Sequence, residues 1–335
     1  MSAYPEYSLN VAIAEFFSQT SASHEACDAK AKDLVGGKVV PVTVQGNCSY
    51  SVYAGPEFEF VVQFRLKSLM LKSEIMALAR KYIAPWPRTL HSTDSWEKMA
   101  KNHYFYLDFV LANGFPENSD ENFVWRKTLM SDVAHFFALS WNAPQGVDSD
   151  YRENLRRTYS KDLQLLFHYL PRRFHQIIQK CLSSMEAILS LPMVLLHRDF
   201  GTCNIMVDGK SCRLAGMIDW AEAEICPFGQ NLHSLQALTG ALHLKNGWRR
   251  YENYGALQDT FWSTFQDEVG DLSAETMKTI KTARIMGLLR SRGFTKRLAN
   301  MPPTTPIRND ETGRYNMLFL DGFLINPATR FDDLN

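Results

Sequence analysis

The 335-residue sequence has no excess of charge of either sign, because 36 Lys and Arg balance 36 Asp and Glu. Proteins that bind nucleic acid or anionic membranes over broad surfaces usually carry a net positive charge. Long apolar runs are also lacking, and the longest, such as residues 188–196, are too short and too interrupted to span a bilayer. We therefore expect neither nucleic acid nor a membrane as a partner.

Clustered cysteines and histidines are lacking as well. The six cysteines include no C-x-x-C pair, which argues against a zinc site. The first residues, MSAYPEYSLNVAIAEFF, lack the basic start and the apolar core of an export signal. These features predict free thiols in a reducing compartment and hence a cytoplasmic protein.

The sequence does contain enough apolar residues for a sizeable core, at 45% hydrophobic and 21% charged. After a helical pattern over residues 8–34, short period-2 runs between residues 39 and 66 predict three strands. From residue 122 onward most patterns are helical, including residues 232–242 and 248–268. The sequence therefore predicts an α+β protein with a small β-rich lobe at 1–110 and a larger helical lobe at 111–335.

The most informative stretch reads LLHRDFGTCNIMVDGKSCRLAGMIDWAEAEICPFG and starts at Leu195. An apolar run leads into His197, Arg198 and Asp199, and Asn204 follows a short turn. Two period-2 runs come next, separated by an Asp-Gly pair that is typical of a hairpin turn. Because the second run ends at Asp219, we expect Asp199, Asn204 and Asp219 to meet at one end of this hairpin.

These residue types fit a phosphoryl transfer site. Such a site needs a carboxylate that orients or deprotonates the acceptor hydroxyl, a role for Asp199, and hard oxygen ligands for Mg²⁺. Asn204 and Asp219 supply such ligands. Any one of them alone is more often a turn residue that bonds to its own backbone. Together with His197 they form four matches in a fixed order, which favours the catalytic interpretation.

The segments HRDFGTCN and MIDWAEAEICPFG resemble the catalytic and metal-binding segments of the aminoglycoside phosphotransferase and choline kinase-like family, and of its fungal branch in particular. That family consists of small-molecule kinases with the protein-kinase-like fold. Ile-Asp-Trp in place of Asp-Phe-Gly, and no Ala-Pro-Glu segment after it, make a protein kinase the weaker interpretation. The resemblance implies two lobes with ATP between them, and it implies that His197 and Arg198 brace the catalytic loop.

The turn between the first two predicted strands is the candidate phosphate-binding loop. It contains Gly46, Asn47, Cys48 and Ser49, whose backbone N–H groups and hydroxyl are suited to lie over nucleotide phosphates. A single glycine is more often an ordinary hairpin residue. Only the position of this turn, in the first hairpin of a kinase-like lobe, favours nucleotide binding. By the same resemblance, residues 107–110 form the hinge next to adenine.

Lysine is lacking on the third predicted strand, where a kinase carries the basic residue that pairs with the phosphates. Arg65 is the best substitute and Gln63 the second, since strand alternation puts both on one face. The alternative is a solvated arginine at a strand edge. By resemblance Glu74, on the next helix, holds that basic residue in place, although a solvent-facing glutamate in a first helical turn is equally expected.

The predicted function is ATP-dependent, Mg²⁺-assisted phosphorylation of a small hydroxylated metabolite or antibiotic-like molecule. The alternative is a kinase-like scaffold that binds a nucleotide or a metabolite without transferring phosphate, and the missing lysine motivates it. The sequence does not identify the acceptor molecule. Glu222 and Glu224 are suited to meet ammonium groups, yet an aromatic content of 12% equally suits a terpenoid or polyketide alcohol.

Overall fold

The protein is described here by a computed structural model. It describes residues 7–46, 49–58, 60–67, 70, 72–83, 91–93, 96–100, 104–106, 119–295 and 304–334. Asn47, Cys48 and the predicted hinge at residues 107–110 lie outside the described residues, as does the predicted lobe boundary at residues 110 and 111.

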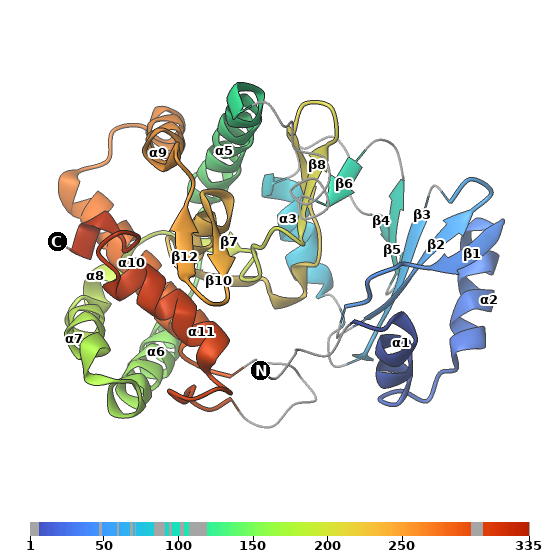
Figure 1. The fold of residues 1–335 in the computed structure, drawn as a ribbon, viewed down its shortest axis with the longest axis horizontal. Helices are drawn as coiled ribbons and strands as arrows, with labels where there is room; N and C mark the ends of the chain where they lie inside the picture. Colours follow the sequence, from blue (N-terminus) through green and yellow to red (C-terminus); the bar gives the residue numbers. More distant parts are fainter. Residues whose placement is uncertain are drawn as a thin grey trace.

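The N-terminal part is a five-stranded antiparallel sheet with the strand order β1-β2-β3-β5-β4. Its strands are β1 (Lys38–Pro41), β2 (Ser49–Gly55), β3 (Phe60–Arg65), β4 (His91–Thr93) and β5 (Trp96–Ala100). Two helices, α1 (Leu9–Phe17) and α2 (His24–Val35), pack against this sheet (Figure 1). The three strands and the helical start that the sequence predicts are therefore present.

A small core of its own holds the N-terminal sheet to α1 and α2. Phe16 of α1 and Ala31 of α2 are buried together with Tyr50 and Val62 of the sheet. The hydroxyl of Tyr50 donates to Asp28 Oδ1 at 2.8 Å. Since their side chains are part of this core, the N-terminal helices stabilise the sheet.

The C-terminal part is mainly helical. Its α-helices are α5 (Ser119–Trp141), α6 (Ser149–Tyr169), α7 (His175–Ser183), α8 (Met185–Ser190), α9 (Tyr254–Val269), α10 (Ala274–Arg292) and α11 (Arg314–Leu320). Short helical turns cover Arg172–Phe174, Trp220–Glu222, Leu232–Leu238, Asp321–Ile325 and Asp332–Leu334. Helix α5 packs along α9, and α10 contacts α6, α7, α8 and α11. Helix α3 (Ser73–Ile83) packs against α5 in this lobe.

The described residues also form three small sheets. One has the order β6-β8-β9, and the others are the pairs β7-β10 and β11-β12. Their strands are β6 (Tyr104–Tyr106), β7 (Met193–Leu196), β8 (Ile205–Asp208), β9 (Leu214–Met217), β10 (Glu224–Pro227), β11 (Gly240–His243) and β12 (Gly247–Arg250). The predicted hairpin over residues 205–218 is confirmed by the β8–β9 pair.

The prediction of continuous helix over residues 232–242 and from residue 248 was wrong. The first segment is only a short helical turn, and β11 and β12 form a hairpin before α9 begins at Tyr254. The cause is the close approach of the two strand backbones at Gly240 and Arg249, which helical periodicity does not reveal. A Cβ at Gly240 would lie 2.4 Å from the backbone oxygen of Arg249, so only glycine fits there.

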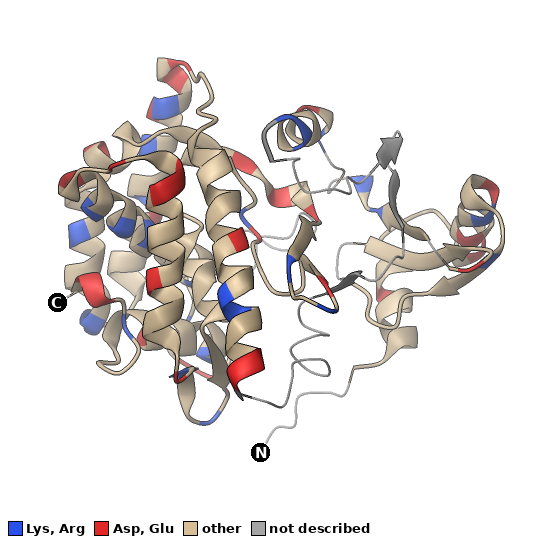
Figure 2. Cartoon of the chain, turned by 90° about the horizontal axis from the view of Figure 1, so that it is seen from above, with Lys and Arg blue, Asp and Glu red and all other residues tan. Residues whose placement is uncertain are grey.

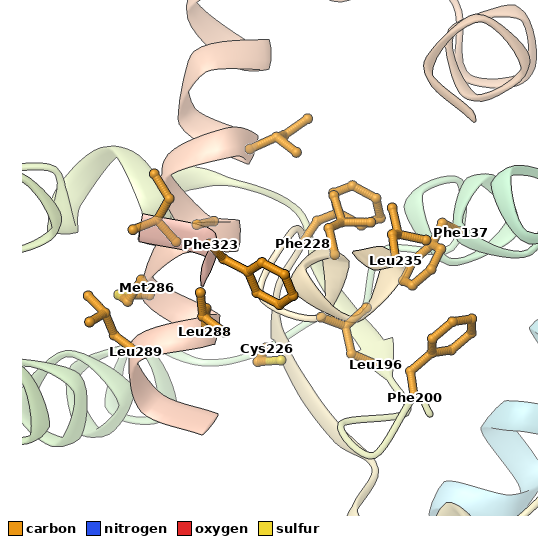
Figure 3. Packing of buried hydrophobic residues seen from close by; sticks show 14 of the residues in the cluster. Phe137, Leu196, Phe200, Cys226, Phe228, Leu235, Met286, Leu288, Leu289 and Phe323 are labelled. Carbon is orange, nitrogen blue, oxygen red and sulfur yellow. The ribbon is translucent and has the colours of Figure 1, made fainter. Parts of the chain in front are cut away.

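The core of the C-terminal lobe extends to both sides of the predicted catalytic loop (Figure 3). Leu196, which precedes the loop, and Ile205, which follows it, are 2% and 0% exposed, and Phe200 within the loop is 3% exposed. The ring of Phe200 lies 5.2 Å from that of Phe137 on α5. Both ends of the loop are therefore anchored in the core.

Basic and acidic residues are interspersed along the helices of the C-terminal lobe (Figure 2). No helix in the described part of the chain is long and apolar enough to cross a membrane. The five cysteines that the structure describes are free thiols.

Candidate active site

His197 supports the predicted catalytic loop from inside. The side chain is 1% exposed, and its Nε2–H donates to the backbone oxygen of Ile218 at 2.6 Å. Its ring lies 4.7 Å from the ring of Trp220. Burial lowers the pKa of His197. A neutral ring that joins the loop to the end of the hairpin fits the bracing role predicted for it.

Asp199 and Asn204 are bonded to each other. The amide nitrogen of Asn204 donates to the backbone oxygen and to Oδ2 of Asp199, each at 2.9 Å. Asn204 is buried, whereas Asp199 is exposed. The buried amide therefore fixes the position of an accessible carboxylate and leaves its own oxygen as the atom suited to bind a cation.

Asp219 reaches the same end of the hairpin through strand pairing. Ile205 of β8 pairs with Met217 of β9, and the N–H of Ile218 donates to the backbone oxygen of Asn204 at 3.0 Å. Asp219 is the next residue, with φ at 60° and ψ at 63°. This left-handed conformation is rare outside glycine and is often found at functional sites. The structure thus gathers Asp199, Asn204 and Asp219 at one end of the β8–β9 hairpin.

Arg65 connects the N-terminal sheet to this hairpin. Its Nη1 donates to Gln63 Oε1 and its Nη2 donates to Asp219 Oδ1, both at 2.8 Å. Gln63 in turn donates to the hydroxyl oxygens of Ser49 at 3.0 Å and Ser51 at 3.2 Å. The side chain of Arg65 is only 6% exposed. The alternative of a solvated arginine at a strand edge is therefore wrong.

Gly46, Ser49 and Glu74 are the other described residues that the sequence predicts at the nucleotide. A Cβ at Gly46 would lie 3.4 Å from the hydroxyl oxygen of Ser49, and that oxygen accepts from Gln63. Glu74 is exposed in the first turn of α3, and the carboxylate bonded to Arg65 is that of Asp219. The predicted roles of Glu74 and of the loop at Gly46 stay predictions.

Arg198 also has a left-handed backbone, with φ at 66°. Its Nε lies 3.6 Å from Glu224 Oε2. Nearby acidic groups raise the pKa of Arg198 against the opposing effect of burial. This contact pairs the loop with Glu224 on β10, which weakens the idea that Glu224 meets an ammonium group of the acceptor.

Sequence reasoning missed two buried polar residues behind the site. Asp132 on α5 accepts from the N–H of Leu214 at 3.0 Å and from Arg213 at 2.9 Å, so it positions the start of β9. His233 lies among Arg198, Arg284 and Arg292, and burial together with these charges lowers its pKa to about 3. The signal for Asp132 was a lone acidic residue within a run of apolar helical positions.

Because His233 stays neutral when folded, acid should destabilise the protein through it. The unfolded chain takes up a proton near pH 6.5, so the stability is fully present above that pH. Below it the unfolding free energy should fall by about 1.4 kcal/mol per pH unit until the folded pKa is reached. We expect His233→Gln to remove this part of the slope in urea unfolding between pH 6.5 and 4.5. His168→Gln, on the exposed face of α6, is the control, and equal slopes in wild type and His233→Gln would contradict the expectation.

Comparisons with known proteins agree with this geometry. Residues 131–258 match the model of the phosphotransferase enzyme family. The matched segment contains His197, Asp199, Asn204 and Asp219, so the match confirms the resemblance predicted from the sequence. A comparison with curated proteins found no match. The fungal branch stays a prediction.

Solved structures resemble the chain over most of its length at low identity. A candidate aminoglycoside phosphotransferase from Ralstonia eutropha is 13% identical with a TM-score of 0.51, covering 81% of this chain and 88% of that one. A macrolide 2'-phosphotransferase type I is 14% identical with a TM-score of 0.49, covering 81% and 91%. A choline/ethanolamine kinase family protein from Mesorhizobium loti is 14% identical with a TM-score of 0.48, covering 80% and 83%.

The likeness to the Ralstonia eutropha structure confirms the predicted α+β, protein-kinase-like two-lobe fold. The chain therefore has a kinase-like fold. Residues 131–258 are similar to a phosphotransferase enzyme family, in agreement with the enzyme type predicted from the sequence.

Proposed function

We propose that this protein transfers the γ-phosphoryl group of ATP to a hydroxyl group of a small molecule, with Mg²⁺ as the metal. The observation that carries the proposal is the bonded pair of Asp199 and Asn204 beside Asp219, within the segment that matches the phosphotransferase family. Asp199 orients the acceptor hydroxyl and accepts its proton as the new bond to phosphorus forms.

The donor atoms at this site suit Mg²⁺. Asn204 and Asp219 present an amide oxygen and a carboxylate, and Mg²⁺ is usually held by one or two carboxylates together with water and phosphate oxygens. Within the described part of the chain, no group of three or more His, Cys, Asp and Glu side chains could hold a metal ion. When bound, Mg²⁺ neutralises phosphate charge.

Most of the rate enhancement would come from positioning. The buried amide of Asn204 holds the carboxylate of Asp199, and the buried ends of the loop fix the backbone between them. Groups held in place before the reaction need no reorganisation when charge develops. Arg65 supplies a positive charge from the sheet, next to Asp219.

One observation favours the scaffold alternative. Arg65 donates to Asp219 Oδ1 at 2.8 Å, so one oxygen of the proposed metal ligand already accepts a hydrogen bond from a guanidinium. Arginine is bulkier than lysine and pairs with carboxylates more rigidly. A protein in which this bond persists would bind a nucleotide without the metal and would not transfer phosphate.

Thermal unfolding with nucleotide separates these functions. We expect Mg·ATP at one hundred times its dissociation constant to stabilise the folded protein by about 2.7 kcal/mol, which raises the melting temperature by several degrees. EDTA should remove most of that shift, and ADP should accumulate when a hydroxylated acceptor is present. A shift that is equal with Mg²⁺ and with EDTA, without ADP release, would support the scaffold. No shift in either condition would contradict both functions.

A further inference from the structure

The side chain of Gln63 lies between Arg65 and two buried hydroxyl groups. Oε1 of Gln63 accepts from Nη1 of Arg65 at 2.8 Å. Nε2 of Gln63 donates to the hydroxyl oxygens of Ser49 at 3.0 Å and Ser51 at 3.2 Å. Both serines are buried. Through Gln63, Arg65 is therefore attached to the interior of the N-terminal sheet.

The chemistry of its neighbours fixes the orientation of the Gln63 amide. A guanidinium contains donors only, so the carbonyl oxygen of Gln63 must face Arg65. A serine hydroxyl accepts as well as donates, so the amide nitrogen fits against the two serines. The pairing of β2 with β3 sets Ser49 opposite Arg65. It sets Ser51 opposite Gln63, so all four side chains lie on one face of the sheet.

The same network reaches the start of the candidate phosphate-binding loop. The N–H of Ser51 donates to Oε1 of Gln45 at 2.8 Å, and Nε2 of Gln45 donates to the backbone oxygen of Ser51 at 2.9 Å. Gln45 is buried and directly precedes Gly46. Hydrogen bonds through Ser51 and Gln63 thus connect the described start of this loop with Arg65.

The other end of Arg65 lies at the candidate metal ligand. Its Nη2 donates to Oδ1 of Asp219 at 2.8 Å, so two nitrogens of one planar group are directed to two different acceptors. A carboxylate in the place of Gln63 would form an ion pair with Arg65 and compete with Asp219 for it. An amide holds the guanidinium without adding negative charge. The charge of Arg65 is thereby kept for Asp219 and for an anionic ligand.

We propose that Gln63 is a positioning residue, whose neutral amide holds the guanidinium of Arg65 at Asp219 and keeps its positive charge for the phosphates of the nucleotide. By resemblance the sequence predicts Glu74 for the holding role, and Glu74 is exposed in the first turn of α3. The inference rests on the proposed phosphotransferase function, because that function places nucleotide phosphates beside Arg65.

Calorimetry of the full chain with Mg²⁺ and a non-hydrolysable ATP analogue tests this role without an acceptor. We expect Gln63→Met to raise the dissociation constant by about 10-fold, the lower end of what a hydrogen bond to a charged group contributes. Arg65→Met should raise it at least as much. In the Arg65→Met background, Gln63→Met should have no further effect, because Gln63 acts through Arg65. An equal loss from Gln63→Met in both backgrounds would indicate a structural role and overturn the inference.

Gln63→Glu tests whether the holding group must be neutral. The new carboxylate can accept from Arg65 and from both serine hydroxyls, so the melting temperature without nucleotide should not fall. Because it neutralises Arg65, the dissociation constant for the analogue should rise by about 10-fold. Wild-type affinity in this variant would overturn the inference. If Gln63→Met is too unstable for calorimetry, Gln63→Glu supplies the result.

Two further variants complete the comparison. Gln164→Met, at an exposed position on α6, is the control and should bind the analogue as wild type does. Glu74→Gln is the competing variant, since Glu74 is the partner of Arg65 that the resemblance implies. If the effect of Glu74→Gln depends on Arg65 more strongly than that of Gln63→Met does, Glu74 holds Arg65 and the inference is overturned.

The inference and the proposed function fail in different ways. Nucleotide binding to which Gln63 and Arg65 contribute independently would overturn the role of Gln63 and leave the phosphotransferase function standing. Dependence of Gln63 on Arg65 without ADP release in the presence of hydroxylated acceptors would support the role of Gln63 and contradict phosphoryl transfer. A wild-type protein that does not bind the analogue would contradict both.

Discussion

Asp199→Asn is expected to lower kcat for phosphoryl transfer by about 10²- to 10⁴-fold, the range that a positioned general base contributes. The replacement removes the group that accepts the proton and keeps an oxygen to which the amide of Asn204 can donate. Because Asp199 is exposed, the fold should not change. The measurement is ADP release with saturating acceptor, together with the melting temperature.

The control for Asp199→Asn is Asp267→Asn, an equivalent change at an exposed position on α9. The nucleotide-dependent melting shift should persist in Asp199→Asn, because Asp199 is not one of the proposed metal ligands. Turnover within a few-fold of wild type would show that Asp199 is not the base. Loss of the melting shift as well would show that Asp199 acts in nucleotide binding.

The β8–β9 hairpin could be predicted from the sequence because its signals are local. The Asp-Gly turn and the two alternating runs fix the pairing of β8 with β9, and that pairing alone places Asn204 next to Ile218. Alternation along β3 likewise put Gln63 and Arg65 on one face, and their side chains are bonded to each other. These features could be predicted because the residues that form them are close to one another in the sequence.

Contacts between segments that are distant in the sequence could not be predicted. Arg65 and Asp219 are 154 positions apart, and no periodicity indicates that their side chains meet. The resemblance placed Glu74 beside Arg65, and this placement stays a prediction; α3, which carries Glu74, packs against α5 and β7.

The bond between Arg65 and Asp219 gives a physical meaning to the missing lysine. The buried guanidinium of Arg65 approaches Asp219, the candidate metal ligand, from the side of the N-terminal sheet. It donates to one of the two carboxylate oxygens of Asp219. A divalent cation must therefore share this carboxylate with Arg65 or displace Arg65 from it. Because an ion and a guanidinium compete for the same charge, metal affinity and the position of the sheet are expected to be coupled at this site.

Asp219→Asn is accordingly expected to abolish the Mg²⁺-dependent part of the ATP melting shift and to lower turnover by about 10²- to 10³-fold, the range of one lost electrostatic group. Asparagine tolerates the left-handed backbone at this position, so the fold should persist.

Since Asp219 is a third exposed, its pair with Arg65 should contribute no more than about 1 kcal/mol without metal. Urea unfolding in EDTA measures that pair, and melting with Mg·ATP measures the metal, with Asp271→Asn before α10 as the exposed control. A full Mg·ATP shift in Asp219→Asn would mean that Asp219 serves only to hold Arg65.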